Sequence, residues 1–293
     1  MQTFVTRWAL SSLLLAFLLA MGATPALAQD DGGNAKKQKL EQLKRSFSSG
    51  LKAAKSNQHS QAYTNLEEAL QLAQEIEVSS AATKIQGYLQ KLPKNWGNKA
   101  IEDKKYEDAR THFDKGIQHA PDDAYMYYGK GLALVNIDST QAGLETMQQA
   151  IEVGNRTGNT RVVGLAEQRI RDEFLAKASK ALNARNPTTA QADSALSALD
   201  QMGQYVDPSA QSLFYRGRAL FEKGDYQQAI SAAQEGLDLH QGSRSDAAKY
   251  YFIIAESQLK TGNKSTACQT FQSATYGDYK ARAEHYLKNE CED

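Results

Sequence analysis

Residues 217–236 read GRALFEKGDYQQAISAAQEG, and the spacing of their small side chains decides the fold. Gly217 is followed by Ala229 twelve residues later and by Gly236 after seven more. Four other places in the chain repeat this spacing with Gly or Ala in every slot. The five sets are Gly50, Ala62 and Ala69; Gly97, Ala109 and Gly116; Gly131, Gly143 and Ala150; Gly217, Ala229 and Gly236; and Ala255, Ala267 and Ala274. This recurrence indicates an internal repeat rather than a single large core.

A second position in each set strengthens the pattern. Helices that cross at short distance need a small side chain at the crossing and a large one beside it. The surrounding sequence is rich in Ala, Leu, Gln, Glu and Lys, which favour helix. We therefore predict an all-α chain of packed antiparallel helix pairs. The residues four positions after the middle small residue are Leu66, Phe113, Met147, Ala233 and Phe271, and only one of them is small.

The turns between the paired helices carry a family resemblance. Tyr106-Glu-Asp-Ala109, Gly224-Asp-Tyr-Gln-Gln-Ala229 and Pro121 at a repeat end resemble the tetratricopeptide repeat (TPR) family. The resemblance implies an α-solenoid, a superhelix of helix pairs closed by a C-terminal capping helix. The solenoid is expected over 38–291, with repeats at approximately 43–76, 90–123, 124–157, 210–243 and 248–281, a degenerate repeat at 171–209, an extra helix at 79–92 and the cap at 276–290.

The first residues read as an export signal. Arg7 precedes an apolar run over residues 8–22, and Ala26-Leu-Ala28 has the form of a cleavage site. The run is shorter than the roughly 20 residues of a membrane span. We expect a signal peptide at 1–28, with an uncleaved anchor as the alternative, and a flexible leader at 29–37. The mature chain is expected in the periplasm without membrane insertion, with secretion as the second choice.

Composition and motifs exclude several functions. The 34 basic and 34 acidic residues balance, so the chain lacks the basic surplus of a nucleic-acid binder. None of the five His forms a metal-binding spacing, and phosphate-binding and nucleophile motifs are absent from the sequence. We predict no enzyme activity, no cofactor and no metal, and we expect each His to be a partly exposed helix residue.

Two cysteines stand near the C-terminus. Cys268 falls in the second helix of the last repeat, and Cys291 follows the cap. An exported protein meets an oxidising compartment, so we predict a disulfide that joins the cap to the repeats. Two free thiols are the alternative.

The TPR resemblance also implies that the first helix of each repeat lines a concave groove that binds peptides or partner helices. Lys94 and Asn98 match the start of the carboxylate clamp of chaperone-binding members, but Gly129 stands where that clamp has Asn, which disfavours this class. The alternative for Phe47, Phe214 and Phe252 is packing between helices. The groove candidates are Phe47, Lys94, Asn98, Tyr125, Tyr128, Leu132, Asn136, Phe214, Arg218, Phe252 and Glu256.

These features together predict a non-catalytic exported scaffold that binds a partner protein or peptide in the cell envelope. The chain resembles periplasmic TPR proteins of Bacteroidetes-type bacteria. The alternative is a structural subunit that self-associates within an outer-membrane or secretion assembly. A homo-oligomer is therefore a possible state of the protein.

Overall fold

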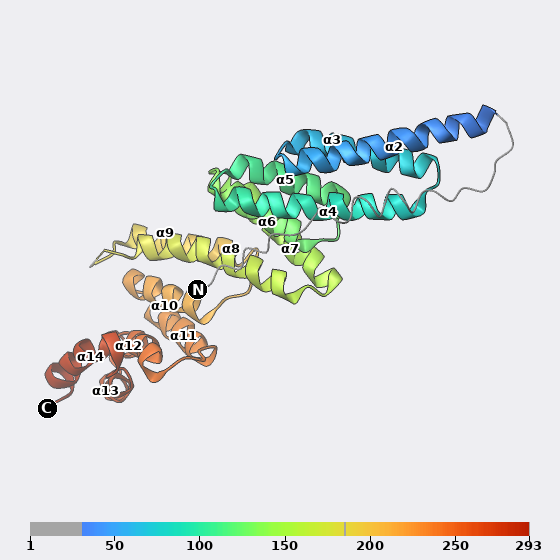
Figure 1. Ribbon diagram of the computed structural model, residues 1–293. Coiled ribbons are helices and arrows are strands. Elements are labelled where there is room, and N and C mark those ends of the chain that lie inside the picture. The colour runs from blue at the N-terminus through green and yellow to red at the C-terminus, as the bar shows by residue number, and fades with distance from the viewer. Residues whose placement is uncertain (1–30, 185, 293) are drawn as a thin grey trace. The chain divides into compact units, whose positions relative to one another are not determined.

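The computed structural model describes residues 31–184 and 186–292, and this part of the chain is helical, without strands (Figure 1). The expected signal peptide at 1–28 lies outside the described residues. Among the described helices, none combines the length and apolar character needed to cross a membrane. The chain divides into two compact units, an N-terminal unit up to Asp122 and a C-terminal unit from Asp123.

The N-terminal unit contains four described helices in two antiparallel pairs. Helix α2 (Asp31–Lys55) packs against α3 (His59–Glu75), and α4 (Ser79–Glu102) packs against α5 (Tyr106–His119). Helix α3 also packs against α4, which joins the pairs. Leu43, Phe47, Leu66, Ile85 and Leu89 are among the buried residues of their shared core.

The C-terminal unit repeats this arrangement four times. Each odd-numbered helix from α7 to α13 packs against the even-numbered helix before it, and α6, α8, α10 and α12 contact one another in succession. A cap segment, residues 277–291, follows the last pair. The elements are α6 (Ala124–Asn136), α7 (Thr140–Thr157), α8 (Thr160–Ala181), α9 (Thr189–Met202), α10 (Ala210–Lys223), α11 (Tyr226–Asp238), α12 (Arg244–Lys260), α13 (Lys264–Ser273), η1 (Gly277–Tyr279), α14 (Lys280–Tyr286) and the π-helical η2 (Leu287–Cys291).

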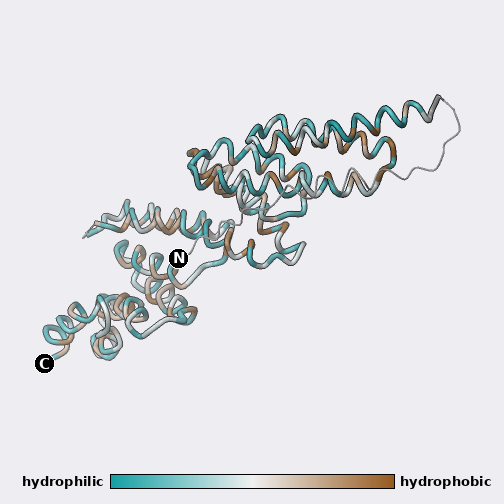
Figure 2. The backbone as a smooth tube through the Cα atoms, viewed as in Figure 1, coloured by the Kyte–Doolittle hydropathy of each residue, from teal (hydrophilic) through white to brown (hydrophobic). Residues whose placement is uncertain are grey.

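The predicted small residues lie at the helix crossings. All fifteen are buried, as are the five residues beside them. A Cβ atom on Gly97 would stand 2.7 Å from Cζ of Phe113, so only glycine permits this approach of α4 to α5. At Gly217 a Cβ atom would stand 3.3 Å from the carbonyl oxygen of Ala229 and 3.4 Å from Cβ of Ala233. Figure 2 shows hydrophobic and hydrophilic residues interleaved along the helices, as expected where one face of a helix is buried.

The prediction of a separate helix at 79–92 ending before Pro93 is wrong. Helix α4 runs unbroken from Ser79 to Glu102 with Pro93 inside it. A proline in a helix interior costs about 3 kcal/mol. Here it lies on the buried stripe of the helix, so packing offsets that cost. The stripe consists of Ala81, Ile85, Leu89, Pro93, Gly97 and Ala100.

Three other boundaries also differ from the expectation. The leader is expected to be flexible up to residue 37, but α2 already begins at Asp31, and the Ala, Lys and Gln residues over 35–39 favour helix. The degenerate repeat begins with α8 at Thr160, earlier than residue 171. The cap is divided among η1, α14 and η2 instead of forming one helix.

Candidate functional site

One hollow of the C-terminal unit gathers four of the predicted groove residues. Phe214 and Arg218 of α10 and Phe252 and Glu256 of α12 line a space of about 520 Å³. Within each helix the two residues are four apart, which places them on the same face. We call this space the cap hollow, because the cap segment closes one side of it. Its other lining residues are Asn186, Phe221, Glu222, Ile253, Tyr279 and Arg282.

Aromatic rings form the floor of the cap hollow. Phe214 is 7% exposed and Phe252 is 1% exposed, so most of each ring is core. The ring of Phe252 lies 5.2 Å from that of Tyr279, and Phe214 lies 5.9 Å from Tyr250. Most of the surface of these two rings is therefore used for packing between helices, as the alternative interpretation states. Only the parts that face the hollow are left for a ligand.

Both arginines of the hollow already have partners. The guanidinium of Arg218 donates to the carbonyl oxygen of Leu182 at 2.7 Å, at the C-terminal end of α8. A cation there offsets the partial negative charge of the helix end. The guanidinium carbon of Arg282 lies 4.2 Å from the ring centre of Phe252, and its Nη2 lies 3.7 Å from Oε1 of Glu256.

The two carboxylates are less well compensated. Glu256 accepts a hydrogen bond from the Tyr286 hydroxyl at 2.9 Å, yet burial raises the pKa of its carboxyl. Burial also raises the pKa of Glu222, although Arg218 and Arg282 act in the opposite direction. Within the described part of the chain, Glu222 has no hydrogen bond or ion pair. The cap hollow thus holds two arginines and two glutamates, and burial disfavours the charged form of both carboxyl groups.

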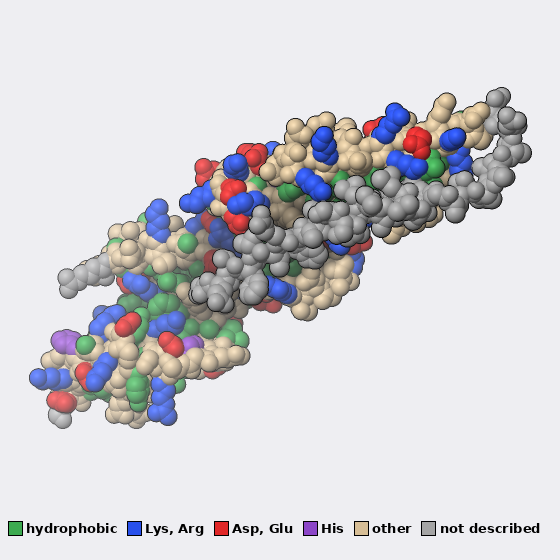
Figure 3. All heavy atoms as spheres, viewed as in Figure 1, with side chains coloured by type: hydrophobic (Ala, Val, Ile, Leu, Met, Phe, Trp, Pro, Cys, Tyr) green, Lys and Arg blue, Asp and Glu red, His purple; other side chains and the backbone are tan. Residues whose placement is uncertain are grey.

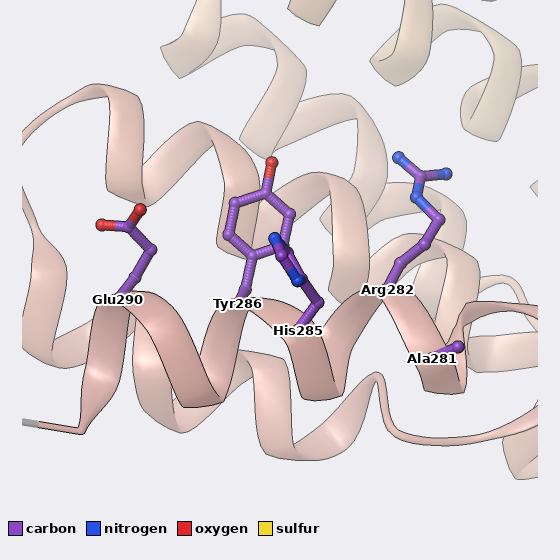
Figure 4. Close-up of a pocket in the computed structure, with 5 residues that line it drawn as sticks. All are labelled: Ala281, Arg282, His285, Tyr286 and Glu290. Carbon is purple, nitrogen blue, oxygen red and sulfur yellow. The ribbon is translucent and has the colours of Figure 1, made fainter.

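A second hollow lies on the cap segment itself. Ala281, Arg282, His285, Tyr286 and Glu290 line it, and all five come from α14 and η2 (Figure 4). Arg282 and Tyr286 rise from the same side of this helical run in Figure 4, and these two residues also contact Glu256. One helical run supplies every wall, so this hollow depends on side-chain positions rather than on an arrangement of several elements.

The remaining groove candidates lie away from the cap hollow. On α6, the rings of Tyr125 and Tyr128 are 6.1 Å apart, and burial raises the pKa of Tyr128. Leu132 packs against the neighbouring core, and the side chain of Asn136 donates to the Leu132 carbonyl at 2.8 Å. These four residues form a separate partly apolar face of α6.

In the N-terminal unit the predicted residues do not meet in a described pocket. Lys94 and Asn98 are partly buried on α4. Phe47 of α2 is 4% exposed, and its ring lies 5.7 Å from that of Tyr88. Phe47 therefore packs between α2 and α4, as the alternative interpretation states.

The N-terminal unit does contain a group that the sequence interpretation missed. Nδ1 of His59 lies 3.1 Å from Nε2 of His112, and the Tyr63 hydroxyl lies 3.2 Å from Nδ1 of His112. The His59 ring stacks on Trp96 with ring centres 4.3 Å apart. We call these four residues the ring cluster. His112 is only 6% exposed, so the expectation of a partly exposed residue is wrong for it.

The ring cluster keeps its histidines neutral. Burial lowers the pKa of His112 to about 4, with a further contribution from His59. Burial also lowers the pKa of His59, against the opposing charge of Asp108. The sequence contained one signal for this group, because His59 and Tyr63 are four residues apart on one helix face. The contact with His112, 53 residues away, required the fold.

A charged network adjoins the ring cluster. Burial opposes ionisation of Glu67, but hydrogen bonds from Lys115 and His119, each at 3.0 Å, lower the pKa of its carboxyl. Among the described residues, no three or more His, Cys, Asp or Glu side chains form a group that could hold a metal ion.

The two cysteines meet at the cap. Their Cα atoms are 5.8 Å apart and their sulfur atoms are in bonding contact, so the geometry suits a disulfide. Whether the thiols are oxidised in the protein stays a prediction.

The family comparison agrees with this architecture. The tetratricopeptide repeat profile matches residues 95–158, 175–244 and 214–283, which together make up more than half of the chain. The chain belongs to the tetratricopeptide repeat family. The first match to this TPR protein begins inside the continuous helix α4, and the expected repeat at 43–76 lies outside the matched ranges.

A curated relative of the TPR protein is the protein STIP1 homolog of Dictyostelium discoideum, 24% identical over 162 residues. The match spans 48% of this chain and 28% of the relative, so the chain corresponds to less than a third of that protein.

Solved structures that the chain resembles include the MamA protein of Desulfovibrio magneticus, 16% identical with a TM-score of 0.35 over 67% of this chain and 96% of that one. Another is YrrB, described as a TPR protein with an unusual peptide-binding site, 17% identical with a TM-score of 0.34 over 68% and 92%. A third is a tetratricopeptide repeat protein of Parabacteroides merdae, 12% identical with a TM-score of 0.30 over 86% and 100%.

Proposed function

We propose that this TPR protein is a non-catalytic scaffold, exported to the cell envelope, that binds a segment of a partner protein in the cap hollow. The observation that carries the proposal is the hollow itself. Equivalent positions of the neighbouring inner helices α10 and α12 line it, and the cap segment closes it. A partner segment would therefore contact two repeats and the cap together.

The chemistry of the cap hollow suits selective binding of a protein segment. Its volume of about 520 Å³ is in the range of typical binding sites, and its walls combine aromatic rings with a few charged groups. Rigid rings provide contact area at low entropic cost, and arginines are frequent in energetically important parts of interfaces. Figure 3 shows acidic and basic side chains interspersed on the drawn face of the described residues, with no large field of one sign. Selectivity would then come from local groups rather than long-range attraction.

A crosslinking experiment tests the site. A photoreactive amino acid replaces Phe221 in the cap hollow, and the matched control places it at the exposed Gln228 on α11. We expect envelope proteins to be captured from position 221 and not from position 228. Equal capture from both positions would remove the cap hollow as the binding site. Capture of a second copy of this chain from position 221 would support the self-associating subunit instead.

The envelope location rests on separate features. Residues 1–28 have the form of an export signal, and the paired cysteines suit an oxidising compartment. Mass spectrometry of the protein from fractionated cells tests the location. We expect a periplasmic chain that begins at Gln29. A cytoplasmic chain that retains residues 1–28 would contradict the proposal.

A further inference from the structure

We infer that the N-terminal unit has a docking surface of its own, along helices α2 and α4, that binds an acidic extended segment of a protein. This surface belongs to the other unit than the cap hollow. The inference therefore goes beyond the proposed function and does not depend on it.

Charge is distributed unevenly among the four described helices of this unit. The first helices of the two pairs, α2 and α4, together carry eleven Lys and Arg residues but only three Asp and Glu residues. The second helices, α3 and α5, carry two basic and six acidic residues. The neutral composition of the whole chain therefore conceals a strongly basic pair of helices in this unit.

Lysines border the line where α2 and α4 meet. The Phe47 ring of α2 lies 5.7 Å from the Tyr88 ring of α4, so the two helices approach each other with the sides that carry these rings. Residues three, four, seven or eight positions apart lie on the same side of a helix. At these spacings from the two rings stand four lysines, which we call the basic row: Lys44 and Lys55 on α2, and Lys84 and Lys91 on α4.

Carboxylates are scarce beside the basic row. Glu41 of α2 pairs with Lys44 at 2.9 Å, and the hydrogen bond from Lys44 lowers the pKa of its carboxyl, with contributions from two further basic residues of α2. Lys55 and Lys91 are exposed, and neither forms an ion pair with a described residue. The fold itself thus leaves positive charge on this surface, and an acidic ligand would supply the missing partners.

The shape of the basic row favours a narrow ligand. Lys44 and Lys55 are eleven positions apart, about 16 Å along the helix, which about five residues of extended chain would span. The side chain of Lys44 is only 23% exposed, and Lys84 is half-buried. A flat anionic membrane or a rigid nucleic-acid duplex would contact the most protruding side chains first. A single extended protein segment can reach the recessed lysines as well.

Peptide binding to the purified protein tests the inference. The probe is a fluorescein-labelled octapeptide with blocked ends in which Glu alternates with Ala, because alternate side chains of an extended chain point the same way. The matched peptide has Gln in place of each Glu. Fluorescence anisotropy should show at least tenfold tighter binding of the Glu peptide, weakening as salt is added. The blocked ends exclude recognition of a terminal carboxylate.

Two double variants separate the basic row from general charge effects. Lys55→Gln combined with Lys91→Gln removes two exposed charges of the row and should reduce affinity for the Glu peptide about tenfold. The matched control combines Lys104→Gln with Lys105→Gln, which removes two exposed charges from the turn between α4 and α5. We expect the control to bind like the unaltered protein. Circular dichroism checks that both variants keep their helix content.

Several outcomes would overturn the inference. Equal affinity for the Glu and Gln peptides, or no binding of the Glu peptide, would do so. Unchanged affinity in the Lys55 and Lys91 double variant would also do so. A loss of binding in Arg282→Gln, with none in that double variant, would place the acidic segment in the cap hollow instead.

Other anionic ligands provide the last comparison. Phosphatidylglycerol vesicles or a DNA duplex that bind through Lys55 and Lys91, while the Glu peptide does not, would assign the basic row to that ligand and overturn the inference. Crosslinking from position 221 examines the cap hollow separately. Failure of the basic row and failure of the proposed function are therefore distinguishable.

Discussion

The two units build similar helix pairs but surround their titratable side chains with different neighbours. The ring cluster of the N-terminal unit fills its space with aromatic and imidazole rings, and its histidines lose their charge. The cap hollow of the C-terminal unit stays open, and two arginines and two glutamates surround it. Burial disfavours the charged form in both places, because it lowers the pKa of His112 and raises the pKa of Glu256, but the hollow also brings opposite charges together. The same packing rule can therefore support a purely structural cluster and a candidate binding site.

The largest expected effect concerns the covalent support of the cap hollow. Replacing both Cys268 and Cys291 with Ala should lower the free energy of unfolding of the C-terminal unit by about 3 kcal/mol, because the disulfide closes a loop of 23 residues in the unfolded chain. Denaturant unfolding measures this loss, and reductant should have no further effect on the double variant. Two free thiols in the unaltered protein, titrated in denaturant without reductant, would contradict the disulfide.

The second effect distinguishes the ring cluster by its response to pH. An unfolded His titrates near 6.5, whereas His112 in the fold has a pKa of about 4. The contribution of neutral His112 to the free energy of unfolding is therefore complete above pH 6.5. It is lost as the pH falls from 6.5 towards 4. Between pH 7.5 and 5.5 we expect a loss of about 1.5 kcal/mol. The fluorescence of Trp96, which stacks on His59, reports this transition locally.

A matched pair of variants tests that assignment. His112→Gln keeps a polar group toward His59 but cannot gain a proton, so its stability should change much less with pH. His285→Gln alters an exposed His of the cap and should keep the full pH dependence. Equal stability of the unaltered protein at the two pH values would remove the ring cluster as an acid-sensitive element.

The third effect compares how tightly the two units pack their crossings. Gly97→Ala should destabilise the N-terminal unit by about 1 kcal/mol, because the new methyl would overlap the fully buried Phe113 ring. Gly217→Ala should change the stability by about 0.5 kcal/mol at most, because the new methyl would stand 3.3 Å from the Ala229 carbonyl oxygen and 3.4 Å from Cβ of Ala233, and the helix propensity of alanine offsets this close contact. Thermal unfolding of both variants measures the difference. Equal destabilisation of the two variants would show that the size of the residue opposite the glycine does not determine how closely the helices cross.

The smallest effect is a gain in stability at the cap hollow. Burial raises the pKa of Glu222, so its carboxylate destabilises the fold at neutral pH. Glu222→Gln should therefore stabilise the protein by a few tenths of a kcal/mol at pH 7 and by nothing well below the pKa of the carboxyl. Denaturant midpoints at both pH values provide the measurement. A loss of stability at pH 7 would mean that Glu222 has a structural partner.

The crossings were the part of the fold most accessible from sequence. Spacings of twelve and seven residues identified five helix pairs, and the register derived from them placed Phe214, Arg218, Phe252 and Glu256 on two neighbouring inner helices. The predicted helix boundary before Pro93 is wrong, because the local cost of a proline in a helix does not include the buried stripe of α4 that offsets it. The sequence alone does not single out Glu222, since nothing local shows that a carboxylate lacks a partner.

The sequence by itself determined the repeat, because a small residue at a crossing is a local requirement that recurs with the helix period. Only the tertiary structure decided the chemistry around those crossings. His59 meets His112, and Glu222 and Glu256 share a hollow with Arg282, through contacts between segments far apart in the chain. Burial and charge depend on what the neighbouring helix brings, and that neighbour is set by the fold rather than by local spacing.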